Sequence, residues 1–315
     1  MKKSKILVIV FKGIGDVILT TPLVRALKEI NSENEVYFLT RKFAAPVLEK
    51  NPNLSGIFIR EEKPLLKILS LKPDISIDFM LSSSSGGYCI FSGASKRLAF
   101  HRPWNGFFYN LRLKTDFEGY TVFKRLEILK LLGINPEPFH SIKPEIFLSP
   151  EEKNSMRELL KEKGLSQSDK IATFDITSPR TYRQLSGDKF ASLADHASSL
   201  GYRVIFHPGP GEESYVNQVS SLCRRKHLIM QRLTLRQLAA LISFSSLHVG
   251  TSSAPMHMAV SFNVPTFTVY SQFTSPKAWS PPSPMHGFIQ GELEKLKKAD
   301  IESGLGSFLR GLEKK

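Results

Sequence analysis

The chain has 315 residues, of which 41% are hydrophobic, and carries a net charge of +14. This is enough for two domains of ordinary size, and no apolar stretch approaches the ~18 residues that a membrane span needs. The two cysteines, Cys89 and Cys223, are too few and too scattered for a disulfide framework or a zinc site. We therefore expect both to be apolar core residues and no metal or cofactor to be bound.

The first predicted element is a buried strand over residues 5–11. Its apolar run is too short for a signal peptide and no cleavage pattern follows it, which predicts a cytoplasmic protein. The strand stops at Gly13-Ile14-Gly15-Asp16, and a helical pattern follows over residues 23–30. Asp16 therefore lies at the carboxyl edge of the first strand, where ligands bind in open α/β sheets. The alternative is that Asp16 only caps the helix.

Apolar runs and helical patterns alternate through the rest of the first half. Further strands are predicted at residues 35–40, 56–60, 74–79 and 97–100, and helices at 43–50 and 122–132. The serine-rich segment 82–87 is predicted to be a mobile loop. Such alternation is typical of a parallel sheet with helices on both faces.

A proline-rich linker at residues 135–144 separates a predicted N-terminal domain, 1–143, from a C-terminal domain, 144–315. Ser149 and Pro150 are typical of a helix start. Strands are predicted at residues 170–175, 203–207, 247–250 and 266–270, and helices at 188–200, 212–222, 235–243, 255–262 and 301–312, the last of which could return to the first domain. The pattern predicts two Rossmann-like, doubly wound parallel-sheet domains that face each other across a cleft.

Two basic segments, residues 79–115 and 214–291, contain no acidic residue. Such segments suit anionic ligands. Nucleic acid is not favoured, because the sequence has no basic helix array, RNA-binding aromatic motif or zinc module. Phosphorylated small molecules or an anionic membrane surface fit better, and a generally basic protein surface is the alternative.

A hydroxyl-rich turn follows the strand that ends at Gly250. Its residues are Thr251, Ser252, Ser253 and Ala254, and a helix begins at Pro255. Free N–H groups and hydroxyls at a helix N-terminus form a cradle for a diphosphate. His257 in the first turn can add a donor. In the alternative, the hydroxyls cap the helix and His257 packs in the core.

Taken together, the segments 13–22 and 250–259 resemble the ADP-heptose:lipopolysaccharide heptosyltransferases of Gram-negative bacteria, which are GT-B glycosyltransferases of family nine. Residues 183–186 stand where that family has Lys/Arg-x-Trp-Pro, and residues 207–213 look like its Gly-Gly-Pro-x-Glu turn. The resemblance implies a GT-B fold and a metal-independent transfer of a sugar from a nucleotide sugar, ADP-heptose in the family, to an anionic, lipid-linked saccharide. Peripheral contact with the inner membrane surface is then expected.

The resemblance implies that Asp16 is the catalytic base and that Arg183 clamps the leaving diphosphate. The absence of an Asp-x-Asp motif agrees with a site that uses cations and helix N-termini in place of a metal. Donor binding is assigned to Ser178, Glu212, Glu213, Gly250, Thr251, Ser252, Ser253, Ala254 and His257. Acceptor binding is assigned to Gly13, Gly15, Lys96, Arg97 and Arg102. The nearby aromatics Trp104, Phe107, Phe108 and Tyr109 are expected either to form an exposed strip that contacts sugar or lipid or to belong to the core.

The sequence departs from the family at two places. The family's Asn-Asp-Ser/Thr-Gly turn is replaced by residues 251–254, so the sugar-binding aspartate is absent at Ser252, and Trp-Pro has become Leu185-Ser186. A paralogue that binds a nucleotide or glycan without transferring heptose is therefore an alternative. A nicotinamide dehydrogenase is disfavoured, because no G-x-G-x-x-G follows the first strand.

Overall fold

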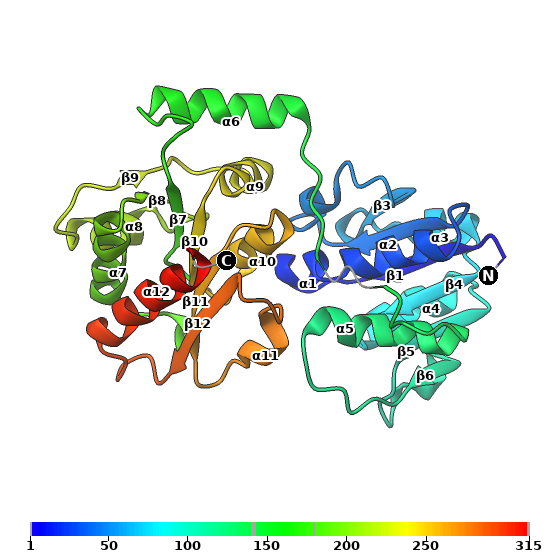
Figure 1. Cartoon of the computed structure of the whole chain (residues 1–315). Helices are drawn as coiled ribbons and strands as arrows, with labels where there is room; N and C mark the ends of the chain where they lie inside the picture. The colour runs from blue at the N-terminus through cyan, green and yellow to red at the C-terminus, as the bar shows by residue number, and fades with distance from the viewer. Residues whose placement is uncertain (1, 140–142, 179, 314–315) are drawn as a thin grey trace. The chain divides into compact units, whose positions relative to one another are not determined.

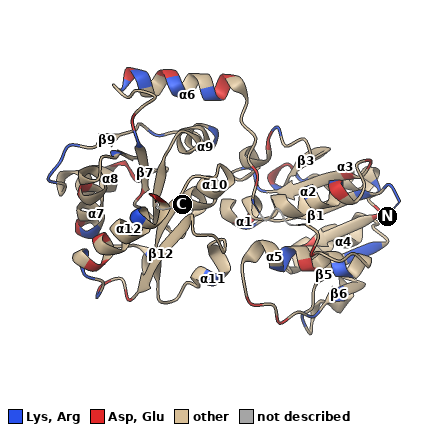
Figure 2. Ribbon diagram, in the orientation of Figure 1, with Lys and Arg blue, Asp and Glu red and all other residues tan. Residues whose placement is uncertain are grey.

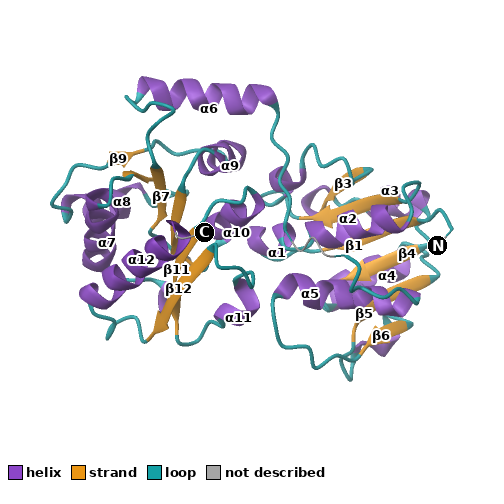
Figure 3. Cartoon of the chain, in the orientation of Figure 1, coloured by secondary structure: helices purple, strands orange, loops and turns teal. Residues whose placement is uncertain are grey.

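The computed structural model describes residues 2–139, 143–178 and 180–313. It consists of two compact units, Met1–Phe147 and Leu148–Lys315, each built on a parallel sheet flanked by helices (Figures 1 and 3). The described part of the expected linker, 135–144, contains neither helix nor strand, and residues 140–142 lie outside the described residues. Within the described ranges, no helix is long and apolar enough to cross a bilayer.

The sheet of the first unit has the order β3-β2-β1-β4-β5-β6 (Figure 1). Its strands are β1 (Lys5–Ile9), β2 (Glu35–Thr40), β3 (Gly56–Ile59), β4 (Ile75–Asp78), β5 (Lys96–Phe100) and β6 (Leu111–Leu113). The strand order reverses where β1 pairs with β2 on one side and with β4 on the other. In such sheets the crevice at the carboxyl ends of the two strands is the usual ligand site.

The helices of this unit are α1 (Ile14–Ile18), α2 (Thr21–Ile30), α3 (Leu65–Leu71), α4 (Ser83–Phe91) and α5 (Thr121–Leu126), with 3₁₀ turns η1 (Ala45–Leu48), η2 (Arg60–Glu62), η3 (Asn105–Phe107) and η4 (Glu127–Leu132). Buried side chains of β1, including Leu7 and Ile9, pack in a core with Ile68 and Cys89. Cys89 is fully buried, which confirms its expected role as an apolar filler.

The serine-rich segment is not a loop, and that prediction is wrong. Ser82 caps α4: its hydroxyl accepts the N–H of Ser85 at 3.2 Å, and the Ser85 hydroxyl accepts the N–H of Ser82 at 3.1 Å. A Cβ atom on Gly86 would lie 2.4 Å from the Phe108 ring, so glycine lets the helix pack against this ring. The serines therefore form a capped helix start with a reciprocal pair of hydrogen bonds.

The sheet of the second unit has the order β12-β11-β10-β7-β8-β9 (Figure 1). Its strands are β7 (Ile171–Asp175), β8 (Arg203–Phe206), β9 (Leu228–Ile229), β10 (Leu247–Thr251), β11 (Thr266–Ser271) and β12 (His286–Gly291). Read from its other end, this is the same order as in the first unit. The order reverses between β7 and β10, which pair directly, so the ligand crevice is expected at the carboxyl ends of these two strands.

The helices of the second unit are α6 (Pro150–Glu162), α7 (Gly187–Ser199), α8 (Glu213–Ser221), α9 (Leu235–Ser243), α10 (Ala254–Ser261), α11 (Pro276–Trp279) and α12 (Lys298–Glu313), with the 3₁₀ turn η5 (Thr181–Arg183). As expected, α6 begins after Ser149, which forms a capping box with Glu152. Figure 2 shows basic and acidic residues along α6, whose apolar side chains Met156 and Leu160 are buried.

The C-terminal helix α12 packs on the core of the second unit. Its apolar side chains Ile301, Leu305 and Leu309 recur at helical spacing and join the core of the second sheet. The Phe308 ring lies 6.0 Å from the ring of Phe267 in β11. The apolar stripe of α12 is therefore covered by the sheet of the second unit.

Candidate active site

Asp16 lies beyond the carboxyl end of β1, in the short helix α1. The N-cap of α1 is Gly13, and no side chain caps this helix within the described residues. The Asp16 carboxylate instead forms an ion pair with Arg125 of α5, with 2.7 Å between Oδ1 and Nη2. Asp16 is therefore not a capping residue, and its side chain is 19% exposed beyond the carboxyl end of β1.

A second carboxyl group, Asp78, ends β4 beside β1. It is fully buried, accepts the N–H of Met80 at 2.7 Å and accepts a short hydrogen bond from the Tyr109 hydroxyl. Burial raises the pKa of Asp78. Of the two carboxyl groups at this edge, Asp16 is the one that a substrate can reach.

The three cations expected to bind the acceptor do not lie together. Lys96 and Arg97 begin β5, at the amino edge of the sheet, whereas Arg102 follows the carboxyl end of β5. The Arg97 guanidinium is also occupied: its Nε donates to the carbonyl of Phe108 at 2.9 Å and its Nη1 to that of Ala94 at 3.2 Å. Of the three, Arg102 alone lies on the edge that carries Asp16.

Arg102 has other basic neighbours at that edge, in and after β6. The backbone N–H of His101 donates to Leu113 at 2.8 Å, which places the ends of β5 and β6 side by side. The pKa of His101 is lowered by desolvation and by the charges of Lys114, Arg112 and Arg102. We refer to Arg102, Arg112 and Lys114 as the basic cluster. Sequence reasoning did not assign its last two members, because β6 was not predicted.

In the second unit, the turn after β10 lies beside the end of β7. Arg183 Nη1 donates to the carbonyl of Ser252 at 3.3 Å, and the Thr251 hydroxyl donates to the carbonyl of Thr177 at 3.3 Å. The Ser253 hydroxyl donates a short hydrogen bond to the carboxyl group of Asp175. The structure thus brings the predicted diphosphate clamp and the hydroxyl-rich turn into one site, which we call the donor site.

The hydroxyls of this turn do not cap α10. Ser253 is the N-cap residue, but it forms no capping hydrogen bond, because its hydroxyl is directed to Asp175. In the described part of the chain, the first turn of α10 therefore lacks a side-chain cap, and its N–H groups suit an anion. His257 in this turn is buried, and its ring lies 6.1 Å from that of Trp279.

The other predicted donor residues lie at or after the ends of β7, β8 and β10. The Glu212 carboxylate accepts the Thr177 hydroxyl and the N–H of Gly209, both at 2.7 Å. A Cβ atom on Gly250 would lie 2.7 Å from the carbonyl oxygen of Asp175, so glycine allows β10 to approach β7. The Ser178 hydroxyl accepts the N–H of Arg180 at 3.2 Å. Glu213 is exposed at the start of α8, and Ala254 is the first residue of α10.

Sequence reasoning missed Asp175, which ends β7 as a carboxylate at the switch point. Its side chain is 5% exposed. Burial raises the pKa of Asp175 to about 7, the Glu212 charge adds to the rise, and the hydrogen bonds from Ser253 and Thr177 oppose it. An aspartate at the end of a predicted strand is the signal that would have found it.

This pKa predicts a specific pH dependence of stability. Between about pH 4 and about pH 7, native Asp175 holds a proton that the unfolded chain has released, so stability falls as the pH rises through this window. We expect the neutral variant Asp175→Asn to gain stability relative to the wild type over this window in urea unfolding. Asp188→Asn, at a carboxylate whose pKa is lowered, should not show this gain. A pH-independent difference between Asp175→Asn and the wild type would contradict this assignment.

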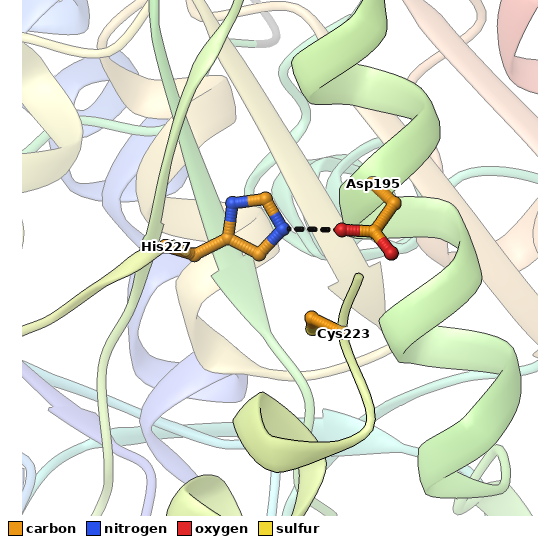
Figure 4. Close-up of side chains that lie close together, drawn as sticks. All are labelled: Asp195, Cys223 and His227. Carbon is orange, nitrogen blue, oxygen red and sulfur yellow. Dashed lines mark hydrogen bonds and ion pairs between the residues drawn. The ribbon is translucent and has the colours of Figure 1, made fainter. Parts of the chain in front are cut away.

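Another polar cluster lies at the opposite, amino edge of this sheet (Figure 4). Asp195 of α7, Cys223 and His227 place their ligand atoms within 4.8 Å of one another, a grouping that could hold a metal ion. The Asp195 carboxylate, however, accepts the N–H groups of Arg224 at 2.7 Å and Arg225 at 3.1 Å, and lies 2.9 Å from His227 Nε2. These bonds explain the cluster as an anchor for the segment before β9.

Comparisons with known proteins agree with this geometry. A family model described as glycosyltransferase family 9 (heptosyltransferase) matches residues 89–308. Lipopolysaccharide heptosyltransferase 3 of Escherichia coli is 23% identical over 279 residues, covering 81% of this chain and 80% of that protein. Two solved structures share the fold. A family 9 glycosyltransferase of Veillonella parvula is 19% identical with a TM-score of 0.87, covering 98% of this chain and 97% of that one. An E. coli ADP-heptose lipopolysaccharide heptosyltransferase II is 18% identical with a TM-score of 0.80, covering 98% of this chain and 99% of that one. The expected GT-B fold class is confirmed.

Proposed function

Since the chain belongs to glycosyltransferase family 9, we propose that it transfers a heptosyl group from ADP-heptose to an anionic saccharide of the lipopolysaccharide type. The observation that supports this most is the kind of residue found at the two switch points, the places where the strand order of each sheet reverses. One carries a reachable carboxylate, Asp16, and the other carries a cation, Arg183, beside the uncapped start of α10. A base for the acceptor and a cradle for a diphosphate are the two parts that direct sugar transfer needs.

In the proposed reaction, an acceptor hydroxyl gives its proton to Asp16 and its oxygen attacks the anomeric carbon of the donor. The new carbon–oxygen bond forms while the bond to the diphosphate breaks, and the electron pair leaves with ADP. Arg183 and the first turn of α10 stabilise the negative charge of this leaving group. The general base contributes roughly 10²–10⁴-fold to the rate.

The acceptor is proposed to bind at the basic cluster, at the same edge of the sheet as Asp16, with Gly13 and Gly15 permitting close approach of the sugar. Lys96 and Arg97 are left out of this proposal, because they lie at the opposite edge. Trp104, 56% exposed, follows Arg102 and offers an aromatic face to a sugar or to lipid. A lipid-linked acceptor would bring the protein to an anionic membrane surface. The cytoplasmic location expected from the sequence stays a prediction.

Removing charge from the basic cluster should affect acceptor binding more than removing the same charge elsewhere on the unit. We expect the double variant Arg102→Ala/Lys114→Ala to raise the acceptor KM several-fold and to leave the donor KM unchanged, with the effect fading at high salt. The matched control is Lys72→Ala/Lys96→Ala, which removes the same charge from the amino edge of the sheet. Steady-state kinetics at varied acceptor concentration would measure both. Equal effects of the two double variants would show that only net charge matters.

The donor is tested by binding. Ser252 stands where the family has an aspartate, and the donor site holds Asp175 nearby through Ser253. We propose that this carboxyl group takes part in recognising the sugar. Titration calorimetry with ADP-heptose and with GDP-, UDP- and dTDP-sugars should give the tightest binding for ADP-heptose, and weaker binding in Asp175→Ala. Tighter binding of another sugar nucleotide would assign a different donor. Binding without turnover would favour a non-catalytic paralogue. That alternative is considered because Ser252 replaces the family's aspartate.

A further inference from the structure

Arg125 is a buried cation that donates hydrogen bonds to the turn that carries Asp16. It lies on α5, its residue is 5% exposed, and its Nη2 is 2.7 Å from Asp16 Oδ1. Its Nη1 forms short hydrogen bonds to the backbone carbonyl of Asp16 and to the hydroxyl of Thr20. The Thr20 hydroxyl in turn donates to the same carbonyl at 2.8 Å. One guanidinium thus holds both the backbone and the side chain of Asp16.

The guanidinium of Arg125 also packs against an aromatic ring, which helps to fix its plane. The Arg125 Cζ atom lies 5.5 Å from the centre of the Phe79 ring, which follows β4. Arginine presents its N–H donors in a rigid fork, so fixing its plane also fixes the direction of each bond it donates. The position of the Asp16 carboxylate therefore depends on α5 and on the end of β4 as well as on its own short helix.

The two carboxylate oxygens of Asp16 have different surroundings. Oδ1 is occupied by Arg125, whereas no described residue donates a hydrogen bond to Oδ2. A Cβ atom built on Gly13 would lie 3.9 Å from Oδ2 and, apart from Gly13 and its two chain neighbours, within 4 Å of no other described atom, so the space between Gly13 and Oδ2 is open. A general base needs one oxygen with a free lone pair directed at its substrate. Oδ2 is that oxygen.

The ion pair is poorly explained as a device for stability alone. Removing a guanidinium and a carboxylate from water costs free energy that their attraction roughly offsets, and apolar residues of similar volume often stabilise a core as well or better. A pair that holds one oxygen and leaves the other open at the carboxyl edge fits a role in orienting the carboxylate.

We propose that Arg125 is a positioning residue for the transfer reaction, which holds the Asp16 carboxylate through Oδ1 so that Oδ2 faces the acceptor hydroxyl. This inference rests on the proposed role of Asp16 as the base. Arg125 touches neither substrate in this scheme, and its effect on the rate passes through Asp16.

A double-mutant cycle tests the proposal, with kcat and the two KM values measured on the full chain using ADP-heptose and a lipopolysaccharide acceptor. We expect Arg125→Met to lower kcat by ~10²-fold and to leave the donor KM unchanged. In the Asp16→Asn background, the same change should lower kcat by less than about threefold, because two residues that act as a unit are not additive. Arg125→Lys, which keeps the charge, should retain part of the activity. In the Asp16→Asn background, Arg125→Lys should also lower kcat by less than about threefold.

The matched control is Arg25→Met. Arg25 is a partly buried arginine of the same unit, paired with Glu145 at 2.6 Å, and its loss should lower the melting temperature while leaving kcat unchanged. If Arg125→Met fails to fold, Arg125→Lys replaces it in the double-mutant cycle with Asp16→Asn. Multiplicative losses in the double variant, or a wild-type kcat in both Arg125 variants, would overturn the positioning role alone. A wild-type kcat in Asp16→Asn would overturn the base and the positioning role together.

Discussion

Replacing Asp16 with asparagine is expected to lower kcat by ~10²-fold or more, because the amide cannot take the proton of the acceptor hydroxyl. Asparagine keeps an oxygen that can accept from Arg125, so the geometry of the turn should survive. The charge of Asp16 is lost, however, which leaves the buried guanidinium without its counter-ion, and the melting temperature should fall as well. Kinetics must therefore be measured well below the melting temperature of the variant.

The control for this experiment is Asp74→Asn. Asp74 accepts the N–H of Lys5 at 2.8 Å at the amino edge of the same sheet, far along the strands from Asp16. This variant should keep a wild-type kcat. Donor binding should also be unchanged in Asp16→Asn, since the donor site lies on the other unit. If Asp16→Asn transfers sugar at the wild-type rate, Asp16 has only a structural role.

The second large effect is expected at Arg183. Its Nη1 is held by the carbonyl of Ser252 at 3.3 Å, its guanidinium lies 5.4 Å from the Tyr182 ring, and its buried Nε has no hydrogen-bond partner among the described residues. A buried donor without a hydrogen-bond partner, beside a helix start without a side-chain cap, suits an anionic group. We expect Arg183→Met to lower kcat by ~10²–10³-fold, because stabilisation of the leaving group is lost.

The neighbouring arginine provides a matched control. Arg180 is exposed and donates to the Tyr182 hydroxyl at 2.9 Å. Arg180→Met removes the same charge from the residue that precedes η5, and it should leave kcat unchanged. Titration calorimetry with ADP should show weaker binding for Arg183→Met and not for Arg180→Met. Equal effects of the two variants would mean that the segment contributes only general electrostatic attraction.

The elements at the two switch points could be predicted from the sequence, because their signals are local. The apolar run before Gly13 stops abruptly and places Asp16 at a strand end, and the turn 251–254 stands between a strand and a helix. Asp16 lies beyond the end of β1 as predicted. The second turn lies between a strand and a helix as predicted but is shorter, because Thr251 belongs to β10 and Ala254 to α10. The roles of these residues stay predictions.

Other parts of the site depend on contacts between distant segments. Arg125 is separated from Asp16 by more than one hundred residues, and nothing in its own helical pattern indicates the ion pair. Lys96 and Arg102 are close in sequence but lie at opposite ends of β5, because five residues of extended chain span about 16 Å. The basic cluster formed instead through β6, a three-residue strand too short to leave a periodic signal.

The central claim is tested most directly by detecting the transferred sugar. The purified chain would be incubated with ADP-heptose and a heptose-deficient lipopolysaccharide acceptor, and the acceptor would then be analysed by mass spectrometry alongside a measurement of released ADP. The proposal predicts one added heptosyl residue per acceptor, an equal amount of ADP, and neither product with Asp16→Asn. An acceptor of unchanged mass, or transfer of a sugar from a different nucleotide in preference to ADP-heptose, would contradict it.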